Sequence, residues 1–165
     1  METRPKLILD LSPTDKLIEI AGWTTLAILW LFTLIIYGNL PEIIPTHFDA
    51  SGQTNDQGPK MTIMFLPVIV TLAFLGLTVL NQYPHIFNYP TNITSNNASR
   101  QYQNATSMIR ILKLILPLVG CFIILMISLT VAGKAEGLRV LLLPLVLGLV
   151  LIPVTYFIVK AIKLK

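Results

Sequence analysis

Charged side chains are scarce in this 165-residue chain: Asp, Glu, Lys and Arg make up 12% of its residues, while hydrophobic residues make up 54%. The mean hydropathy is +0.73. A soluble domain of this composition would leave a large apolar surface in water, so the scarcity of charge excludes that class and favours a membrane protein. Cysteine is rarer still, and the single Cys121 cannot form an internal disulfide.

Four stretches of the chain lack Asp, Glu, Lys and Arg altogether. They lie between Glu19 and Glu42, Lys60 and Arg100, Lys113 and Lys134, and Arg139 and Lys160. A helix that crosses a bilayer needs about 20 predominantly apolar residues, and each stretch can hold one. The sequence therefore predicts an all-α integral membrane protein, a four-transmembrane-helix bundle with spans near residues 20–38, 61–80, 112–133 and 139–160.

Lysine and arginine are unevenly distributed around these spans. Nine of the twelve lie before the first span, between the second and third spans, or at the C-terminus, whereas only Lys60, Lys134 and Arg139 lie elsewhere. Because cytoplasmic flanks retain positive charge, we expect a multi-pass protein of the cell membrane with both termini and residues 81–111 in the cytoplasm. Residues 39–60 are then extracytoplasmic. The net charge of +4 reflects this topology and an attraction to the lipid bilayer, and no nucleic-acid partner is expected.

The first and third helices are predicted to extend into the cytoplasm. Ser12 is a good N-cap and Pro13 suits a first helical turn, so the first helix should begin at Pro13. From Thr94 or Ser95, each a fair N-cap, apolar residues recur at helical spacing up to the third span. We expect this stripe to pack on the first helix or on residues 83–90, forming a small cytoplasmic cap. Its members are Ala98, Tyr102, Ala105, Ile109 and Leu112.

Turn-forming residues dominate the outer segment 39–60. Asp49 to Gly52 favours one turn and Asn55 to Pro59 a second, which predicts a compact loop of two stacked turns. Two interpretations of His47 and Asp49 stay open. Two residues apart in an extended segment, their side chains would share a face and could act as a ligand or proton-transfer pair. Alternatively, both hydrogen-bond the loop to itself.

No metal site, cofactor or enzyme activity is indicated by the sequence. A zinc site takes three or four protein ligands, whereas the second histidine, His85, is predicted to lie across the bilayer from His47. No Ser or Cys nucleophile has an evident base and orienting acid. The middle of each predicted span also lacks Asp, Glu, His and Lys, which disfavours an ion-coupled carrier.

The outer segment resembles the motif of a known family. Its matching residues are Leu40-Pro41, Ile44-Pro45, His47-Phe48-Asp49, Ser51-Gly52, Asp56, Gly58 and Lys60. In the family called domain of unknown function 1648 a similar pattern joins two membrane helices, and a looser resemblance continues into residues 87–90 and 97–102. Related immunity proteins of the sporulation-delay type protect a cell from a membrane-active peptide toxin and relay its presence to a cytoplasmic repressor.

This resemblance implies a membrane protein that binds or senses a ligand, with a role in peptide immunity or envelope signalling. A peptide would bind outside the membrane, and a protein partner would bind inside; a homo-oligomer is an open alternative. The implied outer site consists of Pro45, His47, Asp49, Gly52, Asp56, Gly58 and Lys60, and the implied cytoplasmic site of Asn88, Tyr89, Pro90, Asn97, Arg100 and Tyr102.

The alternative function is a small transporter, or a transporter accessory subunit, for a neutral or lipidic substrate. Prolines within the predicted spans would bend the helices around that substrate. A polar cavity near mid-membrane would favour this hypothesis, whereas close-packed Leu, Ile and Val would argue against it.

Overall fold

The computed structural model describes residues 4–49, 51–138 and 142–164. In chain order its elements are α1 (Pro13–Tyr37), β1 (Ile43–Phe48), β2 (Thr54–Pro59), η1 (Lys60–Met64), α2 (Phe65–Leu80), η2 (Pro84–Ile86), α3 (Ala98–Val131) and α4 (Leu142–Lys163). Four helical segments, α1, η1 with α2, α3 and α4, are long and apolar enough to cross a membrane. The predicted four-helix membrane fold is confirmed. Residues 139–141, where the fourth span was expected to start, lie outside the described residues.

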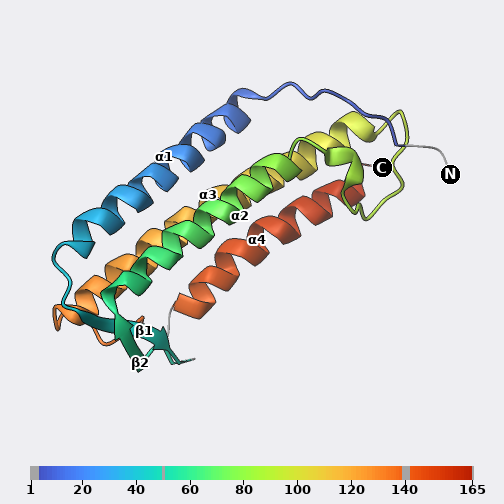
Figure 1. Cartoon of the computed structure of the whole chain (residues 1–165). Helices are drawn as coiled ribbons and strands as arrows, with labels where there is room; N and C mark the ends of the chain where they lie inside the picture. The colour runs from blue at the N-terminus through green and yellow to red at the C-terminus, as the bar shows by residue number, and fades with distance from the viewer. Residues whose placement is uncertain (1–3, 50, 139–141, 165) are drawn as a thin grey trace.

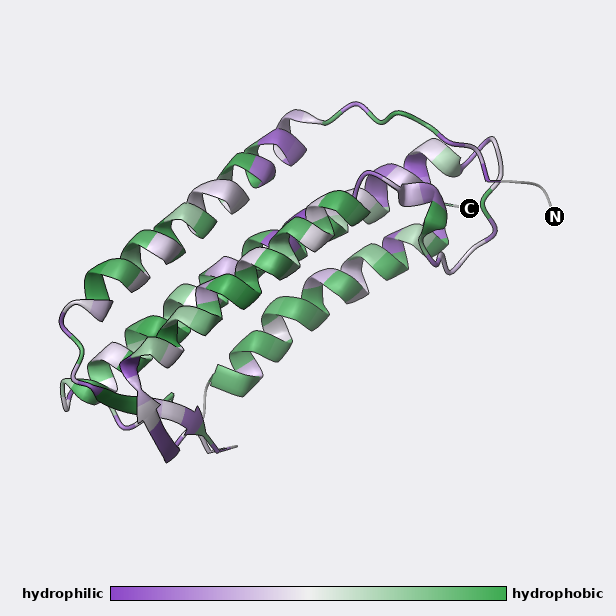
Figure 2. Cartoon of the chain, viewed as in Figure 1, coloured by the Kyte–Doolittle hydropathy of each residue, from purple (hydrophilic) through white to green (hydrophobic). Residues whose placement is uncertain are grey.

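Helix α3 is the central element, and α1, α2 and α4 all pack against it (Figure 1). The β1–β2 hairpin lies at one end of the bundle. At the other end, the Tyr102 hydroxyl donates to the Pro5 carbonyl and the Gln101 amide donates to the Leu164 carbonyl, so the N-terminal segment and the residue after α4 meet there. Polar residues concentrate at these two ends and apolar residues along the helices between them (Figure 2). The hairpin and these terminal segments therefore lie at opposite ends of the bundle, and their assignment to the outer and cytoplasmic sides of a membrane stays a prediction.

The start of α1 follows the predicted capping pattern, whereas α3 starts later than expected. The Ser12 side chain accepts a hydrogen bond from the Asp15 backbone N–H at 3.1 Å, and α1 begins at Pro13. Helix α3 begins at Ala98, with Asn97 as its N-cap. The reason is local: the Asn97 side chain accepts from the Thr94 N–H at 2.9 Å, which holds residues 94–97 in a turn before the helix.

The core at the middle of the bundle joins α1, α2 and α3. Leu29, Phe74 and Ile124 have no exposed surface. A Cβ atom added to Gly120 would lie 3.1 Å from Leu29 Cδ2, so this glycine lets α1 and α3 approach closely, as small residues do in membrane bundles. This core is apolar and packed.

Helix α4 is attached less firmly. Only Phe157 and Ala161, both near its C-terminal end, are buried among its described residues. Much of the rest presents Leu, Ile and Val side chains outward, as expected of a helix that faces lipid.

The structure adds a small antiparallel sheet to the predicted helical fold. The segment predicted as two stacked turns forms a hairpin in which Ile44 pairs with Gly58 and His47 with Asp56. The sequence pattern concealed these strands because Thr54–Pro59 is entirely polar apart from its glycine and proline, so it has no alternation of apolar and polar residues.

Candidate functional site

The hairpin is anchored to the membrane core by apolar residues at its base. Leu40 precedes β1, Ile44 lies within β1 and Ile63 follows β2, and these side chains are 7%, 1% and 3% exposed. All three belong to the cluster that includes Leu29 and Phe74. Burial of an aliphatic side chain contributes about 1.5–3 kcal/mol, so these contacts fix the hairpin against the ends of the helices.

Asp49 organises the turn between the two strands. Its Oδ1 atom accepts hydrogen bonds from the Ser51 hydroxyl at 2.6 Å and from the Ser51 and Gln53 backbone N–H groups at 2.9 Å each. These bonds, led by the one from the Ser51 hydroxyl, lower the pKa of Asp49. Gly52 has a φ of +80°, which favours glycine at this position. Asp49 is therefore ionised at neutral pH and holds the turn.

A hydrogen bond joins this turn to the loop after α3 (residues 132–138). The Leu138 N–H donates to the Gly52 carbonyl oxygen at 2.8 Å. Gly137 has a φ of +69°, and a Cβ atom at this position would overlap the Gly52 carbonyl. The hairpin is thus connected to α1 and α2 through the chain and docked on the end of α3 through this contact.

His47 and Asp56 face each other across the strands, and both are exposed. The His47 ring is paired with the Asn55 side chain, and Asp56 Oδ1 accepts a hydrogen bond from the Gln57 N–H. Asp49 instead bonds to Ser51 and Gln53 within the turn. The structure thus gives His47 and Asp49 separate hydrogen-bond partners within the hairpin, and the strand register sets His47 opposite Asp56.

The remaining motif residues shape the base of the hairpin. Pro45 is buried, and a Cβ atom on Gly58 would lie 3.1 Å from Thr46 Cγ2. Lys60 forms an ion pair with Glu42 at 2.9 Å, and its ammonium lies 5.3 Å from the centre of the Tyr37 ring. The only lysine of the motif is therefore already engaged, and Asp49 and Asp56 give the hairpin tip an acidic surface.

The predicted cytoplasmic site residues lie at the opposite end, in the α2–α3 segment (residues 81–97) and the start of α3. Tyr89 packs between the rings of Phe87 and Tyr102, and its hydroxyl donates to the Pro84 carbonyl at 2.8 Å. Burial raises the pKa of Tyr89, so this hydroxyl stays protonated. Arg4 donates to the Phe87 carbonyl at 2.6 Å and lies over the Tyr89 ring. This aromatic cluster ties the N-terminal segment to α3.

The other predicted residues of this end differ in their surroundings. The Asn97 side chain closes the turn before α3, because it donates to the Asn92 carbonyl and accepts from the Thr94 N–H. Asn88 and Pro90 line a cavity described below. Arg100 is exposed.

Sequence reasoning missed a set of four charged residues between α1 and α3, three of which, Asp15, Arg110 and Lys113, are buried. Lys113, which lies inside the predicted third span, is 1% exposed, pairs with Glu19 at 2.6 Å and lies 4.6 Å from the centre of the Phe74 ring. One turn away, Arg110 pairs with Asp15 at 3.5 Å. The signal was present in the spacing, since the two acids are four residues apart on α1 and the two bases three apart on α3.

Buried amides attach α4 to α3 in the same region. The Gln101 side chain donates to the Ala161 carbonyl at 2.8 Å, and the Asn104 side chain donates to the Phe157 carbonyl at 2.9 Å. Such bonds hold membrane helices together where apolar packing alone is weak.

No group of three or more His, Cys, Asp or Glu side chains with metal-binding geometry occurs within residues 4–49, 51–138 and 142–164. His47 and His85 lie at opposite ends of the bundle, on the hairpin and in η2.

Comparison with known proteins found one family whose model matches the segment that contains the hairpin. An uncharacterized protein of Archaeoglobus fulgidus is 33% identical over 88 residues, and the match covers 48% of this chain and 48% of that protein. The chain thus matches about half the length of this relative. No solved structure matches the chain. Residues 24–71, which include most of α1, the hairpin and the start of α2, match the model of the family described as domain of unknown function (DUF1648), the family that the motif at residues 40–60 resembles.

Proposed function

We propose that this protein is a membrane receptor that binds an extracytoplasmic peptide carrying positive charge along β2 of the hairpin. The observation that carries this proposal is that β2 is exposed, carries an acidic residue and has one unpaired edge, while the turn before it is hydrogen-bonded to the loop after α3. The biological role would be immunity to a membrane-active peptide or envelope signalling.

The free edge of β2 supplies the main binding surface. The sheet described by the structure has two strands, so within the described residues β1 is the only strand that pairs with β2, whereas β1 also contacts α3. Most residues of β2 are exposed. An unpaired strand edge offers N–H and C=O groups to an extended peptide, which can add to the sheet as a further strand.

The charge of β2 favours peptides that carry positive charge. Asp56 lies on β2, and the described residues place no cation in an ion pair with it or with Asp49. Glu42 and Lys60 neutralise each other at the base of the hairpin. Opposite charges attract a partner and align it, so a peptide with Lys or Arg side chains fits better than an acidic one.

The docked turn provides a route across the membrane. A strand added to β2 would press on a hairpin whose turn is bonded to Leu138, in the loop that follows α3. Helix α3 has 34 residues, about 50 Å at 1.5 Å per residue, and its other end carries Gln101 and Tyr102, which bind both terminal segments. A displacement of α3 would therefore change the surface that a cytoplasmic partner meets.

The transporter hypothesis finds less support. Its expected polar cavity would have to replace the packed core at mid-membrane, where Leu29, Phe74 and Ile124 are fully buried. The polar pair described there, Trp30 with Thr71, is joined by its own hydrogen bond of 2.9 Å.

A binding experiment with the full chain in nanodiscs tests the proposal. The probe is a fluorescent peptide of about ten residues with alternating Lys and Val, compared with an alternating Glu and Val peptide. We expect binding of the Lys peptide only, and Asp56→Asn should weaken it about tenfold. The matched control is Glu136→Gln, which removes an exposed acid from the neighbouring loop and should leave binding unchanged. Equal binding of both peptides, or equal effects of the two substitutions, would refute the proposal.

A further inference from the structure

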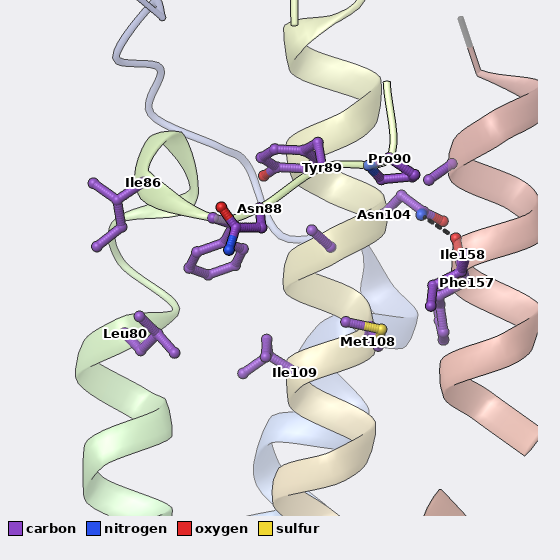
Figure 3. A pocket seen from close by; sticks show the side chains of 13 residues that line it. Leu80, Ile86, Asn88, Tyr89, Pro90, Asn104, Met108, Ile109, Phe157 and Ile158 are labelled. Atoms are coloured by element: carbon purple, nitrogen blue, oxygen red, sulfur yellow. Dashed lines mark hydrogen bonds between the residues drawn. The ribbon is translucent and has the colours of Figure 1, made fainter. Parts of the chain in front are cut away.

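A cavity of about 370 Å³ opens at the terminal end of the bundle. Its walls come from the end of α2 at Leu80, from Ile86 and Asn88 in the α2–α3 segment, and from α3 and α4 (Figure 3). The volume lies within the range of about 300–1,000 Å³ found for small-molecule sites. Most of the wall is apolar, because Met108, Ile109, Phe157 and Ile158 form its membrane side. A hydrocarbon chain matches this lining.

One buried polar atom in the wall lacks a partner. Asn104 is 5% exposed, and its amide nitrogen donates to the Phe157 carbonyl on α4, as the dashed line in Figure 3 shows. Its carbonyl oxygen, Oδ1, makes no hydrogen bond within the described chain. Nearly all buried polar atoms in proteins are hydrogen-bonded, so this oxygen calls for a donor such as a hydroxyl group.

A second, polar cavity adjoins the first. It has a volume of about 710 Å³ and shares Tyr89 and Pro90 with the apolar cavity. Asn92, Asn96 and Asn97 line it, together with Arg100. Arg100 is exposed and its guanidinium forms no ion pair or side-chain hydrogen bond among residues 4–49, 51–138 and 142–164. An anionic group fits beside this arginine, since guanidinium binds phosphate well.

We propose that the two cavities together bind one anionic single-chain phospholipid, a lysophospholipid. Its acyl chain fills the apolar cavity, its free glycerol hydroxyl donates to Asn104 Oδ1, and its phosphate lies by Arg100. The order of groups along such a molecule, chain then hydroxyl then phosphate, follows the order of surfaces from Met108 to Asn104 to Arg100. A diacyl lipid lacks the free glycerol hydroxyl and carries a second chain for which one apolar cavity has less room.

The position in the membrane agrees with this occupant. The cavities lie at the end of the bundle opposite the hairpin, where Lys160 and Lys163 on α4 add positive charge. Clusters of Lys and Arg at this depth attract anionic lipids. This lipid site is separate from the peptide site on the hairpin and does not depend on it.

Native mass spectrometry of the full chain in detergent tests the proposal, with lysophosphatidylglycerol as the probe. We expect one bound molecule and at least about tenfold weaker binding of lysophosphatidylcholine, which has the same chain and hydroxyl but no net charge. Diacyl phosphatidylglycerol should also bind more weakly. An excess of inorganic phosphate should not displace the lipid. Equal binding of all three lipids, or displacement by phosphate alone, would overturn the proposal.

Three variants locate the site. Arg100→Gln should lower affinity for lysophosphatidylglycerol about tenfold and reduce its advantage over lysophosphatidylcholine. Lys16→Gln removes an exposed charge from α1 at the same end of the bundle and should have no such effect. Ile86→Trp, at an exposed position of the cavity wall, should block both single-chain lipids. Equal losses of affinity in Arg100→Gln and Lys16→Gln would show diffuse electrostatic attraction only and would refute the site. Circular dichroism checks that each variant is folded. If Ile86→Trp does not fold, the comparison of the two charge variants alone tests the site.

Discussion

Charged side chains concentrate in the hairpin and at the α1–α3 interface. In the hairpin their bonding partners are near in sequence, whereas at the interface the partners are far apart in sequence. Asp49 hydrogen-bonds to residues two and four positions away, whereas Lys113 reaches Glu19 at a separation of 94 positions. Asp49 and Asp56 on the hairpin are exposed, whereas Asp15, Arg110 and Lys113 between α1 and α3 are buried. Charged groups at the hairpin tip thus stay exposed, while charged groups between the helices pair α1 with α3.

The largest expected effect comes from breaking the buried ion pair. Lys113→Met leaves the Glu19 carboxylate without its partner, and such losses cost about 3–5 kcal/mol. We expect a correspondingly large decrease in the free energy of unfolding, measured by denaturant titration in mixed micelles. The double substitution Lys113→Met with Glu19→Gln should recover much of the loss, because no charge is then left unpaired.

Lys16→Met is the matched control for this prediction. Lys16 is an exposed lysine on α1, so its removal should change stability by less than about 0.5 kcal/mol. If Lys113→Met were no more destabilising than Lys16→Met, the contrast between buried and exposed charges would be wrong.

An intermediate effect is expected where the hairpin meets the loop after α3. Gly133→Ala should cost about 1–2 kcal/mol, because Gly133 has a φ of +68° with no other atom within 4 Å of an added Cβ. Gly137→Ala carries the same backbone strain and also collides with the Gly52 carbonyl. We therefore expect Gly137→Ala to lower the free energy of unfolding more than Gly133→Ala does, and to speed hydrogen exchange of the Leu138 amide.

Comparing the two glycine variants separates the contribution of the contact with Gly52 from that of backbone strain, because only Gly137 lies against Gly52. Equal losses for Gly133→Ala and Gly137→Ala, with unchanged exchange at Leu138, would show that the hairpin and α3 are not coupled through this loop.

The smallest effect is confined to the turn. Asp49→Asn should speed hydrogen exchange at the Ser51 and Gln53 amides, whereas Asp56→Asn should not, because Asp56 bonds to Gln57. The pKa of Asp49 is lowered in the folded chain, so the stability that the carboxylate contributes is fully present above its ordinary pKa of 3.8. Protection of these amides should be constant from about pH 7 to pH 5 and should fall below about pH 4, as the carboxylate is protonated.

Features that depend on residues near in sequence could be predicted from the sequence, whereas pairings between distant residues could not. The helices follow from long charge-free runs, the start of α1 from Ser12 and Pro13, and the turn at Asp49 from neighbouring residues. The pairing of Glu19 with Lys113 could not be assigned, because the spacing of charges on one helix does not reveal which helix faces it.

The candidate sites show the same limit. The motif placed His47 and Asp49 close together in sequence, yet the strand register sets His47 opposite Asp56. Arg100 was predicted from a resemblance, but the apolar cavity that adjoins its polar cavity depends on how α4 packs near Asn104. Hairpin register depends on the turn geometry and on which strand face is buried, and β2 has no apolar pattern that reveals its buried face. Helix packing depends on contacts between residues that are distant in sequence.

The central claim, an outward-facing hairpin edge that binds a cationic peptide, is tested most directly by cysteine labelling at Gln57. Gln57 is exposed on β2, and Cys121→Ala removes the chain's single native cysteine. In intact cells, Gln57→Cys should react with a membrane-impermeant maleimide, and the alternating Lys and Val peptide should slow this reaction. Labelling that requires permeabilised cells, or a rate that the peptide does not change, would contradict the account.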